Sequence, residues 1–175
     1  MIDVLIDSDV PWDSVTVWQV DERVAPDGHA ARNSNQLANL ACLVNVMPVT
    51  ARDLRAAARR YATSLPERFD VVHLGLGDDG HTASWPPGNV ALLGSQRAVE
   101  LVPEFNGWRR MTLTKRVVNA ARSRVVLAVG ASKRPMVERW LLDDGRLPIS
   151  AIRRTDTVGF LDHAARPAAP VDSGG

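Results

Sequence analysis

The chain of 175 residues has one cysteine, few aromatic residues (5%) and a formal net charge of only +1. A lone cysteine, Cys42, excludes a disulfide framework and permits a reducing compartment, so we expect a cytoplasmic location. The balanced charge, with no basic stripe interleaved with aromatics, argues against a nucleic-acid partner. No apolar run approaches the length of about 20 residues that crosses a membrane, and we expect no membrane contact. Cysteine and histidine never stand at zinc-binding spacing, so we expect no metal ion.

What the sequence does contain is the apolar content of a globular domain, 45% hydrophobic residues. We expect one domain over residues 1–163 and a disordered tail over residues 164–175, because the tail is small, Pro-rich and Gly-ended. Strand and helix patterns alternate, as in a parallel sheet with crossover helices. The predicted strands cover residues 15–20, 71–76, 98–102, 111–113, 124–129 and 157–161, and the predicted helices 34–46, 50–64, 114–122 and 132–145.

The most informative stretch is a polar, glycine-rich loop that follows the apolar strand at residues 71–76. Gly75, Gly77 and Gly80 allow the backbone to turn sharply and to approach a ligand, and His81 follows them. In open α/β sheets, ligands bind at the carboxyl ends of the strands. The glycines fit the dinucleotide fingerprint by letter, but the Pro residues at 86–87 end any following helix, so we exclude NAD and FAD. The loop therefore predicts a site of chemistry without a cofactor.

Residues 74–84, Leu-Gly-Leu-Gly-Asp-Asp-Gly-His-Thr-Ala-Ser, resemble the signature loop of the 6-phosphogluconolactonases. Further blocks resemble that family in the same order: the Asp-Glu-Arg at 21–23 followed by Ser-Asn at 34–35, the Arg-Met-Thr-Leu-Thr at 110–114, the Gly-Ala-Ser-Lys at 130–133, and the closing segment from 147 to 162. The collinear match covers residues 12–165. It implies a Rossmann-like three-layer α/β/α fold with a mostly parallel sheet, in the superfamily of the glucosamine/galactosamine-6-phosphate isomerases.

The resemblance implies hydrolysis of 6-phospho-D-glucono-1,5-lactone to 6-phospho-D-gluconate in the pentose phosphate pathway, with no metal or cofactor. We expect His81 to act as general base, because a neutral imidazole suits this role near pH 7. Asp79 or Asp21 would orient it. The candidate substrate and phosphate contacts are Arg23, Arg110, Lys133, Gly77 and Asn35. Of these, Lys133 stands out without the resemblance, since a lysine beside a helix start favours an anion.

The chain departs from the family at its beginning. Nothing resembles the usual amino-terminal section, with its first strand and its Gly-Gly-Ser-Thr-Pro-like loop. We therefore expect a sheet that lacks the amino-terminal strand, with unpaired edges that favour self-association.

Three alternatives stay open. The chain could be an inactive truncated homologue or a non-catalytic sugar-phosphate-binding domain. Deaminase or isomerase chemistry on amino-sugar phosphates is disfavoured, because Thr82-Ala83-Ser84-Trp85 does not supply the glutamate of the deaminase loop.

Overall fold

The computed structural model describes residues 6–7 and 9–167. Its strands are β1 (Thr16–Trp18), β2 (Asp21–Arg23), β3 (Leu43–Asn45), β4 (Val71–Gly75), β5 (Val99–Phe105), β6 (Trp108–Leu113), β7 (Ser123–Ala128) and β8 (Thr157–Leu161). The α-helices are α2 (Leu54–Ser64), α3 (Val90–Leu93), α4 (Lys115–Ala120) and α5 (Arg134–Leu141). Short 3-10 helices are η1 (Trp12–Ser14), η2 (Asn33–Leu37), η3 (Ala131–Lys133) and η4 (Pro148–Ala151).

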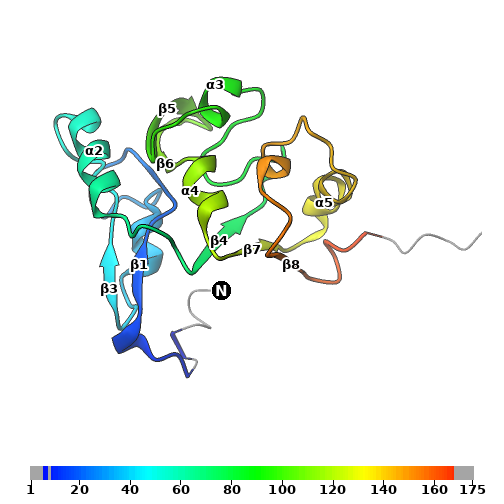
Figure 1. Cartoon of the computed structure of the whole chain (residues 1–175), viewed down its shortest axis with the longest axis horizontal. Coiled ribbons are helices and arrows are strands. Elements are labelled where there is room, and N and C mark those ends of the chain that lie inside the picture. Colours follow the sequence, from blue (N-terminus) through cyan, green and yellow to red (C-terminus); the bar gives the residue numbers. More distant parts are fainter. Residues whose placement is uncertain (1–5, 8, 168–175) are drawn as a thin grey trace, which may run out of the picture.

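The central sheet is parallel and has the order β4-β7-β8. Figure 1 shows it across the middle of the molecule, with α5 at one side and the β1–β3 pair at the other. The alternating burial of β7 places Val126 in the core, while Leu74 of β4 is also buried. These strands were predicted from their apolar runs, and the prediction is confirmed, with β8 matching residues 157–161.

The segment at residues 15–23 differs from the prediction, which was one strand over residues 15–20 that ends before Asp21. β1 pairs in parallel with β3, and the chain then changes sheet at Gln19, so that β2 pairs antiparallel with β6. Asp21 and Glu22 therefore lie within a strand, not after the end of one. At this change of sheet the N–H of Gln19 donates to the carbonyl of Asn45 at 3.2 Å, and its buried side-chain carbonyl accepts from the N–H of Met47 at 2.7 Å.

The prediction of a helix at residues 34–46 is wrong. This segment forms only the short 3-10 helix η2 and then strand β3. The carboxylate of Glu22 accepts hydrogen bonds from the backbone N–H groups of Asn33 and Ser34, and no side chain caps η2, which Arg32 precedes. Pairing of β3 with β1 satisfies backbone groups that a helix would otherwise have satisfied internally.

The other predicted helices form, with differences at their ends. Asp53 caps α2 by accepting from the N–H of Ala56 at 3.0 Å. Ser132 does not cap α5, because its hydroxyl donates to Asp78 instead. In α5, Val137 and Trp140 are buried, whereas Leu141 is half exposed because the helix ends there.

Residues 99–113 form a β-hairpin that the sequence analysis divided into two isolated short strands. Asn106 and Gly107 both have positive φ angles, 50° and 76°, which a two-residue type I′ turn requires. The turn places Phe105 opposite Trp108. A bulge in β5 lies between Val102 and Phe105, a stretch that includes Pro103, which has no N–H to donate to the neighbouring strand.

One hydrophobic core joins the three sheets. Its fully buried members include Met47, Met111, Val126 and Ile149, together with Trp85, whose Nε1 donates to the carbonyl of Leu113 at 2.8 Å. None of the helices in the described part of the chain has the length and apolar character that crossing a membrane requires.

The start of the predicted tail is attached to this fold. Ala165 is fully buried and donates its N–H to Asp162, and Arg134 donates to the carbonyl of Ala164. Residues 168–175 of the predicted tail lie outside the described residues.

Candidate active site

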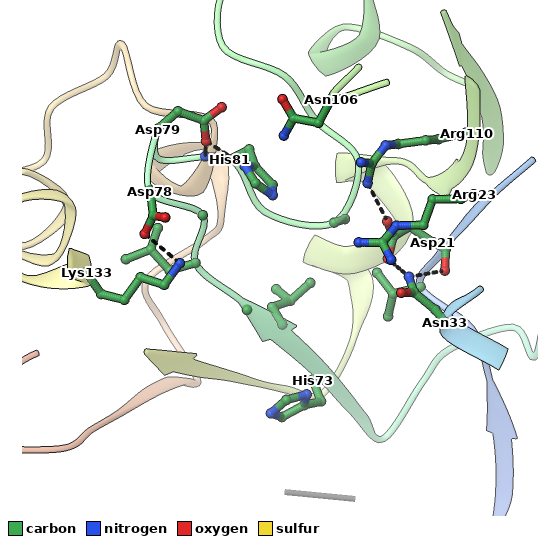
Figure 2. Close-up of a pocket in the computed structure, with 16 residues that line it drawn as sticks. Asp21, Arg23, Asn33, His73, Asp78, Asp79, His81, Asn106, Arg110 and Lys133 are labelled. Atoms are coloured by element: carbon green, nitrogen blue, oxygen red, sulfur yellow. Dashed lines mark hydrogen bonds and ion pairs between the residues drawn. The ribbon is translucent and has the colours of Figure 1, made fainter. Parts of the chain in front are cut away.

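A cavity of about 590 Å³ opens at the carboxyl end of β4. Figure 2 shows His81 with Asp79, the ion pair of Lys133 and Asp78, and the arginine side chains around it. The residues that line the cavity are Val20, Asp21, Arg23, Asn33, His73, Leu74, Gly75, Leu76, Gly77, Asp78, Asp79, His81, Ala83, Asn106, Arg110 and Lys133. Every predicted site residue except Asn35 is therefore in one cavity.

His81 and Asp79 form a closely coupled pair. The Asp79 carboxylate accepts the backbone N–H of His81 at 3.0 Å and lies 2.5 Å from the ring Nδ1. With the proton on Nδ1, the Nε2 atom is the one that accepts a proton from a substrate or water. Partial burial works to raise the pKa of Asp79, but the two hydrogen bonds from His81 outweigh it and hold that pKa below its ordinary value. Asp79 thus stays ionised and fixes the ring.

The loop that carries His81 folds back on itself. The N–H of Gly77 donates to the carbonyl of His81 at 2.8 Å, and the N–H of Gly80 donates to the carbonyl of Gly77 at 3.0 Å. The hydroxyl of Thr82 donates to the carbonyl of Gly75. Gly80 needs its φ of 85°, which other residues rarely adopt. These bonds fix the loop before any substrate arrives.

Lys133 and Asp78 form an ion pair on the other side of this loop. The Lys133 Nζ lies 2.8 Å from Asp78 Oδ1, and the hydroxyl of Ser132 donates to the same carboxylate. The hydrogen bond and charge of Lys133 lower the pKa of Asp78. Lys133 sits at the junction of η3 and α5, as predicted, and Asp162 holds the turn before it by accepting the N–H of Gly130. The pair therefore joins the β4 loop to the β7 loop.

Asp21 faces the cavity from β2. Its carboxylate accepts from the hydroxyl of Ser84 at 2.5 Å and from the amide of Asn33 at 3.2 Å. Arg110 Nη1 lies 3.9 Å away from it. Burial raises the pKa of Asp21, and the opposing effects of Ser84 and of Arg110 do not fully cancel the rise. An acid of raised pKa in a cavity is a candidate for proton transfer.

Arg23 and Arg110 place two guanidinium groups at this end of the cavity (Figure 2). Arg23 donates through Nη1 to the carbonyl of Ala31, while its Nε is buried without a partner among the described residues. Arg110 donates through Nε to the carbonyl of Phe105 at 3.0 Å. A guanidinium group is positively charged and planar, and it can donate two parallel hydrogen bonds to a phosphate. This pair of arginines is therefore suited to bind an anion.

Glu22, which the sequence analysis did not single out, anchors this end of the site. It is fully buried, forms an ion pair with Arg32 Nε at 3.0 Å, and accepts hydrogen bonds from the side chain of Gln19 and from the N–H groups of Arg23, Asn33 and Ser34. Burial acts to raise its pKa, but these hydrogen bonds lower it below the ordinary value. No sequence pattern signalled this burial, since an Asp-Glu-Arg run is typical of a surface.

Asn35 lies outside the cavity lining. The 3-10 helix η2 directs its amide toward the carbonyl of His29, to which it donates at 2.9 Å. Asn33, two residues earlier, lines the cavity instead. His73 of β4 also lines the cavity, and burial lowers its pKa. Among residues 6–7 and 9–167, no group of three or more His, Cys, Asp or Glu side chains is arranged to hold a metal ion.

The family described as "Glucosamine-6-phosphate isomerases/6-phosphogluconolactonase" matches residues 1–160. A 6-phosphogluconolactonase of Synechocystis sp. is 36% identical in an alignment of 143 positions that covers 71% of this chain and 59% of that protein. One from Nostoc sp. is 31% identical, over 89% of this chain and 74% of its own length. The crystal structure of a 6-phosphogluconolactonase from Shewanella baltica superimposes with a TM-score of 0.81 at 26% identity, over 91% of this chain and 77% of that one. These similarities support the expected three-layer α/β fold.

Proposed function

The chain belongs to the glucosamine-6-phosphate isomerase/6-phosphogluconolactonase family, and on that premise we propose that it hydrolyses 6-phospho-D-glucono-1,5-lactone to 6-phospho-D-gluconate. The observation that carries the proposal is the Asp79–His81 pair in a cavity that also holds Arg23, Arg110 and Lys133. An imidazole held by a carboxylate supplies a base, and the cations supply charge for a phosphate.

In this mechanism His81 Nε2 takes a proton from water, and the resulting hydroxide attacks the lactone carbonyl. The tetrahedral intermediate carries a negative charge, which the cationic side chains of the cavity stabilise. Collapse breaks the bond between the carbonyl carbon and the ring oxygen, and the imidazolium returns its proton to that oxygen. The reaction consumes one water and leaves His81 neutral, with Asp79 holding the ring in place throughout.

The phosphate contacts in this proposal are Arg23, Arg110 and Lys133. The N–H groups of Gly77 and Gly80 donate within the loop, so we assign the oxyanion not to these glycine amides but to the one of these three cations that the phosphate leaves free. Asp21, buried beside Arg110, is the second candidate for moving a proton.

The test is formation of 6-phosphogluconate from the purified lactone, measured above the rate of spontaneous ring opening. The His81→Asn variant, which lacks the proposed base, is the control. Enzymatic turnover lost in this variant supports the proposal, whereas equal rates with and without protein contradict it. Release of ammonia from glucosamine 6-phosphate would instead favour the deaminase alternative.

We also propose that the chain associates with itself through the β4-β7-β8 sheet. In the described residues β4 and β8 are its outer strands, and Val71, Val158 and Phe160 are each at least half exposed. Exposed apolar groups on edge strands favour pairing with another copy. Sedimentation over a range of concentrations tests this, and a monomer at all of them contradicts it. A cytoplasmic location stays a prediction.

A further inference from the structure

Phe105, at the end of β5, contacts both the imidazole of His81 and the guanidinium of Arg110. Its ring centroid is 5.1 Å from that of the His81 imidazole, with the two planes nearly perpendicular at 86°. On the same ring the guanidinium carbon of Arg110 lies 5.1 Å from the centroid. The backbone carbonyl of Phe105 also accepts from Arg110 Nε at 3.0 Å. One residue therefore contacts both the expected base and an expected phosphate ligand.

The hairpin fixes where this ring points. The type I′ turn at Asn106 and Gly107 sets Phe105 opposite Trp108, and the bulge before Phe105 shifts the register of β5 by one residue. Because neighbouring residues on a strand point to opposite faces, such a shift decides which side chain of β5 reaches His81 and Arg110. Trp108, across the turn, packs instead on His29, at 5.1 Å between centroids.

These contacts restrict both partners. An aromatic face attracts a guanidinium and limits its rotamers, and the carbonyl fixes Nε, which leaves the terminal nitrogens of Arg110 for an anion. The Asp79 carboxylate holds the imidazole of His81 at Nδ1, and the perpendicular packing of Phe105 adds a second contact to the same ring.

We propose that Phe105 is a positioning residue, which holds the imidazole of His81 and the guanidinium of Arg110 in the geometry that the reaction uses. The role in the reaction rests on the lactonase proposal. The contacts of Phe105 themselves are tested by NMR and by phosphate binding, which need no lactone turnover. Phe105 itself touches no reacting atom in this scheme.

The variants are Phe105→Leu, which removes the ring and keeps an apolar side chain, and Phe105→Tyr, which keeps the ring. Trp108→Leu is the matched control, because it makes the same change across the same turn. Phe105→Met is a second ring-free variant, for the case that Phe105→Leu does not fold. The first readout is the NMR spectrum of the four histidine rings, with the His81 signals assigned from His81→Asn.

We expect Phe105→Leu and Phe105→Met to move the His81 ring signals and to leave those of His29, and Trp108→Leu to do the reverse. Phe105→Tyr should keep the His81 signals near their original positions. Inorganic phosphate, titrated by the same method, should bind about 3- to 30-fold more weakly to the ring-free variants, as loss of a cation–π contact implies. In an Arg110→Lys background this loss should shrink, because the planar guanidinium is already absent.

Unchanged His81 signals and phosphate affinity in folded Phe105→Leu or Phe105→Met would overturn the inference. So would equal losses in the ring-free variants and Trp108→Leu, since that result means a general effect on the hairpin. With lactone as substrate, the ring-free variants should both raise KM and lower kcat, whereas Phe105→Tyr should restore both. Absence of lactone turnover in the unaltered protein would contradict the proposed function and leave the NMR and phosphate outcomes to decide on Phe105.

Discussion

Gly77 and His81 are in such close contact that no side chain fits between them. A Cβ atom at Gly77 would lie 2.0 Å from Nδ1 of His81 and 2.1 Å from its Cε1. The backbone of Gly77 also donates to the carbonyl of His81. The glycine is therefore required by the position of the ring, and its φ angle is not the reason, in contrast to Gly80.

The Gly77→Ala variant should displace the His81 ring and break its bond to Asp79. We expect turnover to fall by about 10²-fold or more, the range in which loss of general base catalysis lies. The matched control is Gly145→Ala, where an added Cβ meets nothing within 4 Å. Near-normal turnover in Gly77→Ala would mean that the ring is not needed where the structure places it.

The His81→Asn variant should lower kcat by about 10²–10⁴-fold, because the amide keeps a polar group but cannot take up the proton. His29→Asn removes an imidazole that lies outside the cavity and should retain turnover. Both are measured with the lactone after subtraction of spontaneous opening. Full activity of His81→Asn would make Asp21 the next candidate for the base.

The Lys133→Ala variant should raise KM by roughly 10- to 100-fold, the range that loss of one charge-assisted hydrogen bond gives, with a smaller effect on kcat. Lys115, the only other lysine of the chain, lies outside the cavity lining, and Lys115→Ala is the control. A fall in kcat at unchanged KM would move Lys133 from phosphate binding to the chemical step.

The Glu22→Gln variant should be less stable than the parent protein at pH 7 by about 3 kcal/mol, since it removes the buried carboxylate that pairs with Arg32 and leaves only the exposed Asp27 as an acidic partner of that arginine. The pKa of Glu22 is lowered in the folded state. The ionised carboxylate therefore contributes fully to the free energy of unfolding above the ordinary pKa of 4.5, and this contribution is lost as pH falls through the pKa of the folded state. The difference in unfolding free energy between the two proteins should therefore narrow in acid.

Chemical denaturation at several pH values measures this difference, and Glu104→Gln, on an exposed position of β5, is the control. A difference that stays constant down to pH 3 would show that the charge of Glu22 does not carry the effect.

The Asp21→Asn variant should separate stability from activity. The pKa of Asp21 is raised by burial, so ionisation opposes folding at neutral pH, and this penalty vanishes as pH falls below the ordinary value of 3.8. We expect Asp21→Asn to melt at the same or a higher temperature at pH 7, with reduced lactone turnover. A clear loss of thermal stability at pH 7 would contradict the prediction.

Local patterns were enough to predict part of the site. The glycines, the acidic pair and His81 stand together in the sequence, so the loop after β4 and its Asp79–His81 pair could be proposed directly. The turn before Lys133 could be proposed in the same way. The Asn106-Gly107 dipeptide is also a hairpin signal, and a predicted hairpin would have placed Phe105 directly before its turn.

The sequence by itself determined the strands with continuous apolar runs, β4, β7 and β8, and the loop at the end of β4, because these depend on neighbours along the chain. Only the tertiary structure decided that Asp21 meets Ser84 across 63 positions, that Glu22 is fully buried, and that residues 43–45 form a strand. These outcomes depend on which strand edges and which polar groups need partners, and a one-dimensional pattern does not contain that information.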